Sequence, residues 1–445
     1  MEDLRSDDFD ASKWKGSCSR IDDPRYVEYW KRFYAEVGHV DIDKVRRDTL
    51  VYGAKGANLD VLAGFISKIV GFDPEVGHFE VPEYIKIPVD VFIKWRNGED
   101  IVDDLRPYYE WAKGKEVVLR SSAVFSEDGD DRMGPGLYES IDNSGRSFEK
   151  FIEDIIKVFS SVDNPEAVRY REELGIKDEL MGIVVQENVA DFEDVYYDKC
   201  FFSVDSTCCQ VPRLIRATDT ANGTTGLIYK DVLESQLVSS EFISLDDEKL
   251  YHCMVDGQLT LNYEMFKTAL LSLYLERYYG RGVQIESRAG DKGGYLLQVR
   301  PLPWRYFEEN NVEFPEGDCL YRGRAVGVGD MVLDVLDNRP DNREKEGVVV
   351  MVSDCSMGDS YGRNVFYWPK RGGLILLSPP SPMKAHLESL CAEKGILCIA
   401  SKNVCSLLPG QLDEDGLNFL SKINSGVLSQ VRMVLNGVEG RVYEV

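Results

Sequence analysis

The chain has 445 residues, 43% of them hydrophobic and 29% charged, which is typical of a globular protein with two or three domains. Its formal net charge of −25 disfavours nucleic acids and anionic membranes as partners. The start MEDLRSDDFD lacks the apolar core of a signal peptide, and no apolar stretch is long enough to span a bilayer. The 10 cysteines include no C-x-x-C pair, so we expect a cytoplasmic protein with reduced thiols and no zinc site.

Residues 1–45 are predicted to form an acidic, aromatic-rich extension. Its large apolar residues are spaced to share one face of a helix. These residues are Tyr26, Tyr29, Trp30, Phe33 and Tyr34. We expect this helix to pack on the domain that follows, with no binding role.

A glycine-rich segment, Gly53–Leu59, follows the apolar run Leu50-Val51-Tyr52. The run predicts a strand, and the apolar spacing from Leu59 to Val70 predicts a helix. Glycines at such a strand-to-helix turn allow backbone N–H groups to point at an anion, and Lys55 adds positive charge. The segment is therefore a candidate phosphate site.

The stretch 117–140, VVLRSSAVFSEDGDDRMGPGLYES, is the second candidate. Val117–Leu119 predicts a buried strand that delivers Arg120, Ser121 and Ser122 into an acidic loop. An Arg fork and small hydroxyl residues beside a flexible loop suit polyphosphate binding. The alternative is a surface arginine beside a solvated turn.

Three further elements follow before the second domain. The 3.6-residue spacing of apolar residues predicts a helix over 148–175, and 181–189 is predicted to be a buried strand. A hairpin is predicted with strands 283–286 and 295–301. Glu286, Gln298 and Arg300 are expected to project from one face of it.

A second pattern begins at Tyr321, with core strands predicted at 348–352, 374–377 and 396–399. Ser381 and Pro382 predict the start of a helix that Gly395 ends. His386 lies near the first turn of this helix, where partial positive charge favours a neutral, nucleophilic imidazole and stabilises a phosphate on its ring. The alternative is a partly exposed histidine on an ordinary helix.

Several of these segments resemble one family in the same order. RSSA, the acidic pair after it and GPGLYES resemble the ATP-binding domain of phosphoenolpyruvate synthase, pyruvate phosphate dikinase and rifampicin phosphotransferase. GAKGANL, VVQENV and the LLQVRP hairpin are similar to further segments of that domain. The resemblance implies an ATP-grasp domain in which Glu286 and Gln298 bind Mg²⁺ and Arg300 neutralises the transferring phosphates. It implies that ATP is bound by Lys55, Arg120, Ser121, Ser122, Glu139, Gln186, Glu187 and Val189.

AHLESLCAEKGI, which contains His386, resembles the phosphohistidine segment of the swivelling domain that follows the ATP domain in this family. Lys384 stands where the family usually has a hydroxyl residue, and it is a candidate phosphate clamp. We therefore expect an α/β (α+β) chain in which a small β/β/α swivelling domain follows the ATP-grasp domain. The expected parts are an extension at 1–45, an ATP domain at 46–305, a linker at 306–320 and the swivelling domain at 321–445.

The resemblance implies an ATP-dependent phosphotransferase in which His386 takes a phosphoryl group and passes it on, with AMP and phosphate as products. No segment resembles the family's pyruvate barrel, so we expect a small-molecule acceptor or a separate acceptor protein. One alternative is an ATP-driven ligase, as in the similar condensing enzymes of prodigiosin-type biosynthesis. Another is a nucleotide-binding pseudoenzyme or assembly subunit, because the family's lid glycines and the residues before its histidine differ here.

Overall fold

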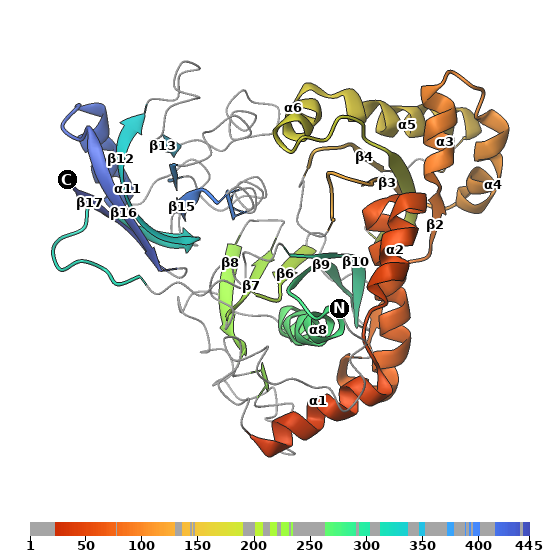
Figure 1. Ribbon diagram of the computed structural model, residues 1–445, viewed down its shortest axis with the longest axis horizontal. Coiled ribbons are helices and arrows are strands. Elements are labelled where there is room, and N and C mark those ends of the chain that lie inside the picture. Colours follow the sequence, from red (N-terminus) through yellow and green to blue (C-terminus); the bar gives the residue numbers. More distant parts are fainter. Residues whose placement is uncertain are drawn as a thin grey trace. The chain divides into compact units, whose positions relative to one another are not determined.

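The computed structural model (Figure 1) describes residues 23–76, 78–129, 136–142, 145, 147–189, 201–207, 214–219, 224–230, 233–234, 263–290, 293–302, 312–336, 347–351, 372–377, 388, 391–392, 395–400, 414–436 and 439–445. They form two compact units, the first within 24–204 and 262–303 and the second within 205–261 and 304–445. Both units contain helices and strands, which confirms the predicted mixed α/β class. Among the described helices, none combines the length and the apolar character needed to cross a membrane.

One sheet of the first unit carries the RSSA segment. Its strands are antiparallel and lie in the order β2-β5-β3-β4. Their bounds are β2 Tyr84–Ile87, β3 Val117–Ala123, β4 Ser140–Asp142 and β5 Met181–Glu187. The predicted strands at 117–119 and 181–189 are thus confirmed, and β3 continues through Arg120 and both serines.

Helices surround this sheet in Figure 1. They are α3 Val89–Arg96, α4 Val102–Ala112, α5 Phe148–Ser160 and α6 Pro165–Glu173. The single helix predicted over 148–175 is wrong in one respect. A short 3₁₀ turn, η3 (Ser161–Asp163), separates α5 from α6 because Pro165 has no N–H for a continuing helix and starts the next one instead.

A second sheet carries the predicted hairpin, which is confirmed. Within the first unit its strands lie in the order β1-β10-β9-β6, and their bounds are β1 Phe79–Glu80, β6 Phe201–Asp205, β9 Val283–Gly290 and β10 Gly293–Pro301. β9 and β10 are antiparallel, with a β-bulge at Leu297. Helix α8 (Tyr263–Tyr279) packs against β9 and β10.

Helix α2 (Ile42–Phe72) contacts both sheets and contains the GAKGANL segment. The strand predicted at Leu50-Val51-Tyr52 is wrong, because these residues are helical and belong to the first part of α2. Gly53 has φ 76° and ψ 167° and kinks the helix, so that a second helical part starts directly after it. The helix predicted from Leu59 onward is confirmed.

Helix α1 (Pro24–Glu36) packs as its aromatic face predicts. Trp30 and Phe33 lie edge-on to each other, with ring centroids 5.2 Å apart, and Phe33 stacks on Tyr274 of α8 at 5.7 Å. Phe33 also contacts Phe72 at the end of α2, at 5.5 Å. The N-terminal helix is therefore part of the core of the first unit.

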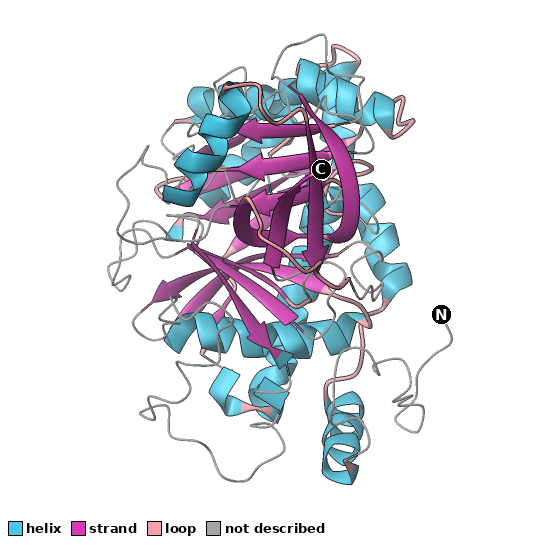
Figure 2. Cartoon of the chain, turned by 90° about the vertical axis from the view of Figure 1, so that its left-hand side faces the viewer, coloured by secondary structure: helices cyan, strands magenta, loops and turns pink. Residues whose placement is uncertain are grey.

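The second unit contains a closed barrel with strand order β11-β15-β14-β13-β12-β16-β17. Figure 2 shows the C-terminus among these strands. Their bounds are β11 Tyr321–Val326, β12 Val328–Leu336, β13 Val348–Met351, β14 Gly373–Leu376, β15 Leu397–Ala400, β16 Gln430–Asn436 and β17 Glu439–Glu444. The three predicted core strands are confirmed as β13, β14 and β15. Pairing of β17 with β11 closes the barrel.

Helix α11 (Glu414–Asn424), which the sequence analysis did not predict, packs on this barrel: Phe419 stacks on Tyr321 with ring centroids 5.6 Å apart. The same unit contains the antiparallel pair β7 (Leu214–Asp219) and β8 (Thr224–Tyr229). Gly395 has φ 70°, and the N–H of Ile396 donates to the carbonyl of Cys391 at 2.9 Å. This is the helix end predicted at Gly395.

We expect Gly53→Ala to destabilise the first unit by more than about 3 kcal/mol, because it combines backbone strain with a steric clash. A Cβ on Gly53 would lie 1.7 Å from the carbonyl oxygen of Ser122. The matched control is Gly64→Ala in the same helix, where a Cβ meets nothing within 4 Å and should stabilise by about 1 kcal/mol. Urea unfolding measures both, and equal midpoints for the two variants would contradict the packing described here.

Candidate functional site

The candidate site is a cluster of charged residues between α2, the loop after β3 and the β9–β10 hairpin. Glu127 and Asp128 belong to this loop, and both are buried, with 5% and 1% of their surface exposed. The Nζ of Lys55 lies 3.0 Å from Glu127 Oε1 and 3.6 Å from Asp128 Oδ2, and it donates to the carbonyl of Ser121 at 2.9 Å. The glycine-rich segment and the RSSA segment therefore meet, as a shared site requires.

Asp128 joins this loop to the second sheet. Its carboxylate accepts a hydrogen bond from Gln298 Nε2 at 2.9 Å and pairs with Arg300 Nη1 at 3.0 Å. Gln298 and Arg300 both belong to β10, whereas Lys55 reaches Asp128 from α2. One carboxylate thus connects three elements that are distant in the sequence.

The backbone around the cluster is held in an unusual conformation. Asp128 has φ 52°, in the left-handed region that residues other than glycine rarely adopt. Its carbonyl accepts from Asn58 Nδ2 at 3.2 Å, and the N–H of Gly56 donates to Ser122 Oγ at 2.9 Å. These bonds fix the loop against the start of the second part of α2.

One face of the hairpin carries the other predicted residues. Gln298 pairs with Glu286 and Arg300 with Gln284 across the two strands, so that all four side chains lie on one face. Arg300 Nε donates to Gln284 Oε1 at 2.7 Å. This confirms that Glu286, Gln298 and Arg300 share a face, and it shows that Gln284 orients Arg300.

Arg120 extends from β3 toward the same hairpin. Its Nη1 donates to the carbonyl of Leu297, the bulged residue of β10, at 3.2 Å, and its Nη2 lies 4.0 Å from Glu286 Oε2. Ser121 Oγ donates to Glu127 Oε2 at 3.3 Å. Arg120 and both serines therefore lie in or beside the cluster.

The end of β5 lies outside this network of contacts. The N–H groups of Glu187 and Asn188 donate to Glu83 and Glu116 carbonyls, both within 2.9 Å, so these two groups are already used within the protein. Val189 is buried. Gln186 is 2% exposed, and its Nε2 has no hydrogen-bond partner in the described part of the chain. A buried amide N–H without an acceptor is a position where a ligand could bind.

Glu139, a further predicted ATP-binding residue, does not join the cluster. The side chain of Glu139 is exposed. The backbone N–H of Glu139 donates to Ser161 Oγ at 3.3 Å. His386 and Lys384 lie outside the described residues.

The cluster balances three cations, Lys55, Arg120 and Arg300, against the carboxylates of Glu127, Asp128 and Glu286. Burial raises the pKa of Glu127 from its ordinary value of 4.5 to about 7, and the adjacent Asp128 charge adds to the rise, although Lys55 opposes it. Near neutral pH Glu127 can therefore hold or release a proton. This allows the charge of Lys55 to be shared with a second anion.

The same face can offer oxygen atoms to a metal ion. Glu286 contributes a carboxylate that is 36% exposed, and Gln298, which directs its nitrogen at Asp128, retains its amide oxygen. Two hard oxygen donors fit Mg²⁺, which keeps several waters and also binds phosphate oxygens. No group of three His, Cys, Asp or Glu side chains suited to a metal occurs in the described residues.

Glu127, Asp128, Gln284 and Asn58 were not among the predicted site residues. A signal existed for the first two, since the acidic pair is part of the pattern that identified RSSA. Gln284 and Asn58 lie in the hairpin and in the GAKGANL segment, but their contacts depend on cross-strand pairing and on the fold of the loop.

Residues 89–197 match the family model for the pyruvate phosphate dikinase AMP/ATP-binding domain. The match includes Arg120, both serines and β5, and it supports an ATP-binding domain in the first unit. No curated protein matches the chain.

Two solved structures of D-alanine–D-alanine ligase from Bacillus anthracis are similar at 12% identity and a TM-score of 0.23. The match to the ligase complexed with ATP covers 60% of this chain and 63% of the ligase chain. The match to the second ligase structure covers 61% of this chain and 66% of the ligase chain. Similarity this low carries no functional assignment. The chain spans less than two thirds of these ligase chains.

We expect Glu127→Gln to stabilise the protein more at pH 8 than at pH 5. Between about pH 4.5 and 7, Glu127 keeps its proton in the folded protein but loses it in the unfolded chain. The contribution of Glu127 to stability is therefore fully present below pH 4.5 and is lost as the pH rises through 7. The difference between variant and wild type should grow by about 3 kcal/mol at most across this window. Urea unfolding at several pH values measures it, with the exposed Glu139→Gln as control. A difference that does not change with pH would exclude a raised pKa at Glu127.

Proposed function

We propose that the first unit binds ATP with Mg²⁺ and that the chain is an ATP-dependent phosphotransferase. The observation that carries this proposal is the family match over residues 89–197, combined with the geometry of the cluster. Lys55 and Arg300 lie outside the matched residues, yet both contact Asp128, next to Arg120 and the serines. Cations from three elements converge there, as binding of a polyphosphate requires.

Lys55, Arg120 and Arg300 would bind the phosphates in this proposal. All three are paired with carboxylates in the structure, so an incoming phosphate competes with Glu127, Asp128 and Glu286. When Glu127 is protonated, it no longer neutralises Lys55, and the charge of Lys55 can interact with the phosphate. A pKa of about 7 means that Glu127 takes up this proton near neutral pH. Gln186, with its unpartnered Nε2, the carbonyl of Glu187 and the backbone of Val189 would face the adenine base.

Glu286 and Gln298 would hold the metal ion, which neutralises phosphate charge when it is bound. Arg120 lies near Glu286, and Arg300 lies on the same strand as Gln298. The proposed metal ligands therefore have a cationic side chain close to each of them. This arrangement would hold a phosphate chain through charge and hydrogen bonds alone. Positioning and charge neutralisation are the main requirements of phosphoryl transfer.

The proposed acceptor of the phosphoryl group is His386, which passes it to a small molecule or a separate protein. The overall reaction converts ATP, water and an acceptor hydroxyl into AMP, phosphate and the phosphorylated acceptor. The nucleophilic nitrogen of His386 forms a bond to the β-phosphorus while the bond to the α-phosphate oxygen breaks, and water releases the γ-phosphate. Lys384 would balance the charge of the phosphorylated ring.

The metal assignment predicts that Glu286→Gln raises the Mg²⁺ concentration needed for half-maximal ATP binding by about tenfold or more, because it removes the anionic donor. Fluorescent ATP-analogue binding at increasing Mg²⁺ measures this. Glu80→Gln on β1, an exposed position of the same sheet, should not change the Mg²⁺ dependence. An unchanged Mg²⁺ dependence in Glu286→Gln would remove Glu286 from the metal site.

The histidine assignment predicts that incubation with Mg²⁺ and β-labelled ATP gives AMP and acid-labile label on the protein, and that His386→Ala loses both. The control is His78→Ala, an exposed histidine of the first unit. Formation of ADP, or of a condensed product with loss of phosphate, would instead indicate direct transfer or ligation. Tight ATP binding without any turnover, with candidate acceptors present, would indicate a nucleotide-binding pseudoenzyme.

A further inference from the structure

A buried carboxylate, that of Glu179, lies where β3 and β5 stop pairing. Beyond the last paired residues of the two strands, the N–H of Val124 still donates to the carbonyl of Leu180 at 2.9 Å. The next N–H, that of Phe125, donates to Glu179 Oε1 at 2.9 Å. The side chain of Glu179 thus replaces the backbone acceptor that the strand ladder no longer supplies.

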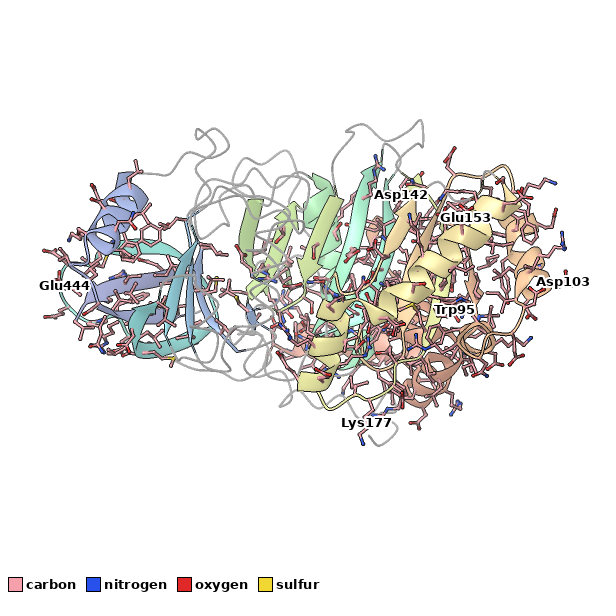
Figure 3. All side chains as sticks on the ribbon, turned by 90° about the horizontal axis from the view of Figure 1, so that it is seen from above. Trp95, Asp103, Asp142, Glu153, Lys177 and Glu444 are labelled. Carbon is pink, nitrogen blue, oxygen red and sulfur yellow. The ribbon has the colours of Figure 1, made fainter. Side chains whose placement is uncertain are left out.

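Several donors share the carboxylate of Glu179. Its Oε1 also accepts from the N–H groups of Val124 and Leu180, both at 3.1 Å, and its Oε2 accepts from the Tyr138 hydroxyl at 3.4 Å. Glu179 is 6% exposed, whereas Lys177, two residues earlier, is exposed and lies at the periphery of the first unit in Figure 3. Burial of a carboxylate is favourable only with such donors, so Glu179 and the loop after β3 fix each other.

Tyr138 extends this attachment to the next residue of the loop. Its hydroxyl lies 2.6 Å from Ser126 Oγ and accepts from Arg171 Nη1 at 3.2 Å. Burial raises the pKa of Tyr138 above its ordinary value, so the hydroxyl keeps the proton that it donates to Glu179. Residues 124–126 are therefore held on one side by a carboxylate and a phenol.

The next two residues of the loop are held from the other side. Glu127 pairs with Lys55 and Asp128 pairs with Arg300, both at 3.0 Å. The left-handed backbone of Asp128, with φ 52°, is unfavourable for a residue with a side chain and persists only where the surroundings restrict it. Since neighbouring residues cannot move independently, the attachment of 124–126 limits where these two carboxylates can lie.

We propose that Glu179 is a positioning residue of the candidate site: it fixes the loop after β3 so that Glu127 stays buried against Lys55. Glu179 acts through backbone N–H groups and through Tyr138. Because an amide oxygen in the same place can accept the same N–H bonds, the length of this side chain matters more than its charge. In the proposed function the loop carries carboxylates that compete with phosphate, and only the consequence for nucleotide binding rests on that function.

The titration of the Glu127 carboxyl tests this proposal. It is followed by NMR in the full chain with isotope-labelled glutamate, and Glu127→Gln identifies the signal. Besides burial, Lys55 of α2, the adjacent Asp128 and Arg300 of β10 act on the pKa of Glu127, which is about 7. Burial is the largest of these effects, so a shifted loop that exposes Glu127 to water should lower this pKa toward 4.5.

Two variants of Glu179 separate position from charge. Glu179→Asp keeps the charge but is one methylene too short to reach the same N–H groups, so it should lower the pKa of Glu127 by at least about one pH unit. Glu179→Gln removes the charge but keeps the length and an acceptor oxygen, and it should leave this pKa unchanged. The control Leu105→Ala, at a buried position of α4, weakens the fold through packing and should also leave it unchanged.

A third variant reaches the same loop without changing Glu179. Tyr138→Phe removes only the hydroxyl that contacts Glu179 and Ser126, and it should lower the pKa of Glu127 in the same direction. A fall in Glu179→Gln as large as in Glu179→Asp would overturn the proposal, because charge would then decide. An unchanged pKa in Glu179→Asp, or an equal fall in Leu105→Ala, would overturn it as well. ATP is absent from these titrations, so a wild-type chain that binds no ATP would contradict the proposed function alone.

Discussion

The carboxylate of Asp128 is the interaction on which the rest of the candidate site depends. It is buried, and it faces Lys55 from α2 and both Gln298 and Arg300 from β10. Burial of a charge is unfavourable unless opposite charges and hydrogen bonds compensate it, and here they come from segments that are 170 residues apart in sequence. The two sheets of the first unit can therefore satisfy this group only when they are correctly placed against each other.

The same balance determines how the cluster can respond to a ligand. Lys55 and Arg300 are held in place by the carboxylates beside them, so their side chains are oriented before any phosphate binds. The same carboxylates compete with the phosphate for these two cations. The raised pKa of Glu127, about 7, allows this carboxylate to become neutral in place. Asp128 thus maintains the structure of the cluster, while Glu127 can adjust its charge.

The sequence predicted those elements whose patterns are local: the aromatic face of α1, the strands β3 and β5, the β9–β10 hairpin and its shared face. It failed where the outcome depends on distant contacts. Leu50-Val51-Tyr52 has the composition of a strand, yet Gly53 only kinks a longer helix, because its missing Cβ lets the helix approach the Ser122 carbonyl. The pairing of Glu127 with Lys55, 72 residues away, and the closing of the barrel by β17 were equally invisible.

The first part of the loop after β3 is held by buried charged groups at two places. Glu179 accepts from the amides of Val124 and Phe125, and Asp128 binds Arg300 and Gln298. Between them, Ser126 forms a hydrogen bond with Tyr138 at 2.6 Å, and Tyr138 also accepts from Arg171. Such a loop retains the left-handed conformation of Asp128 because every neighbour restricts it. A change at Arg171 or Glu179 would therefore act on the loop that carries Glu127 and Asp128, since Glu179 accepts from two of its amides and Arg171 holds Tyr138, the partner of Ser126.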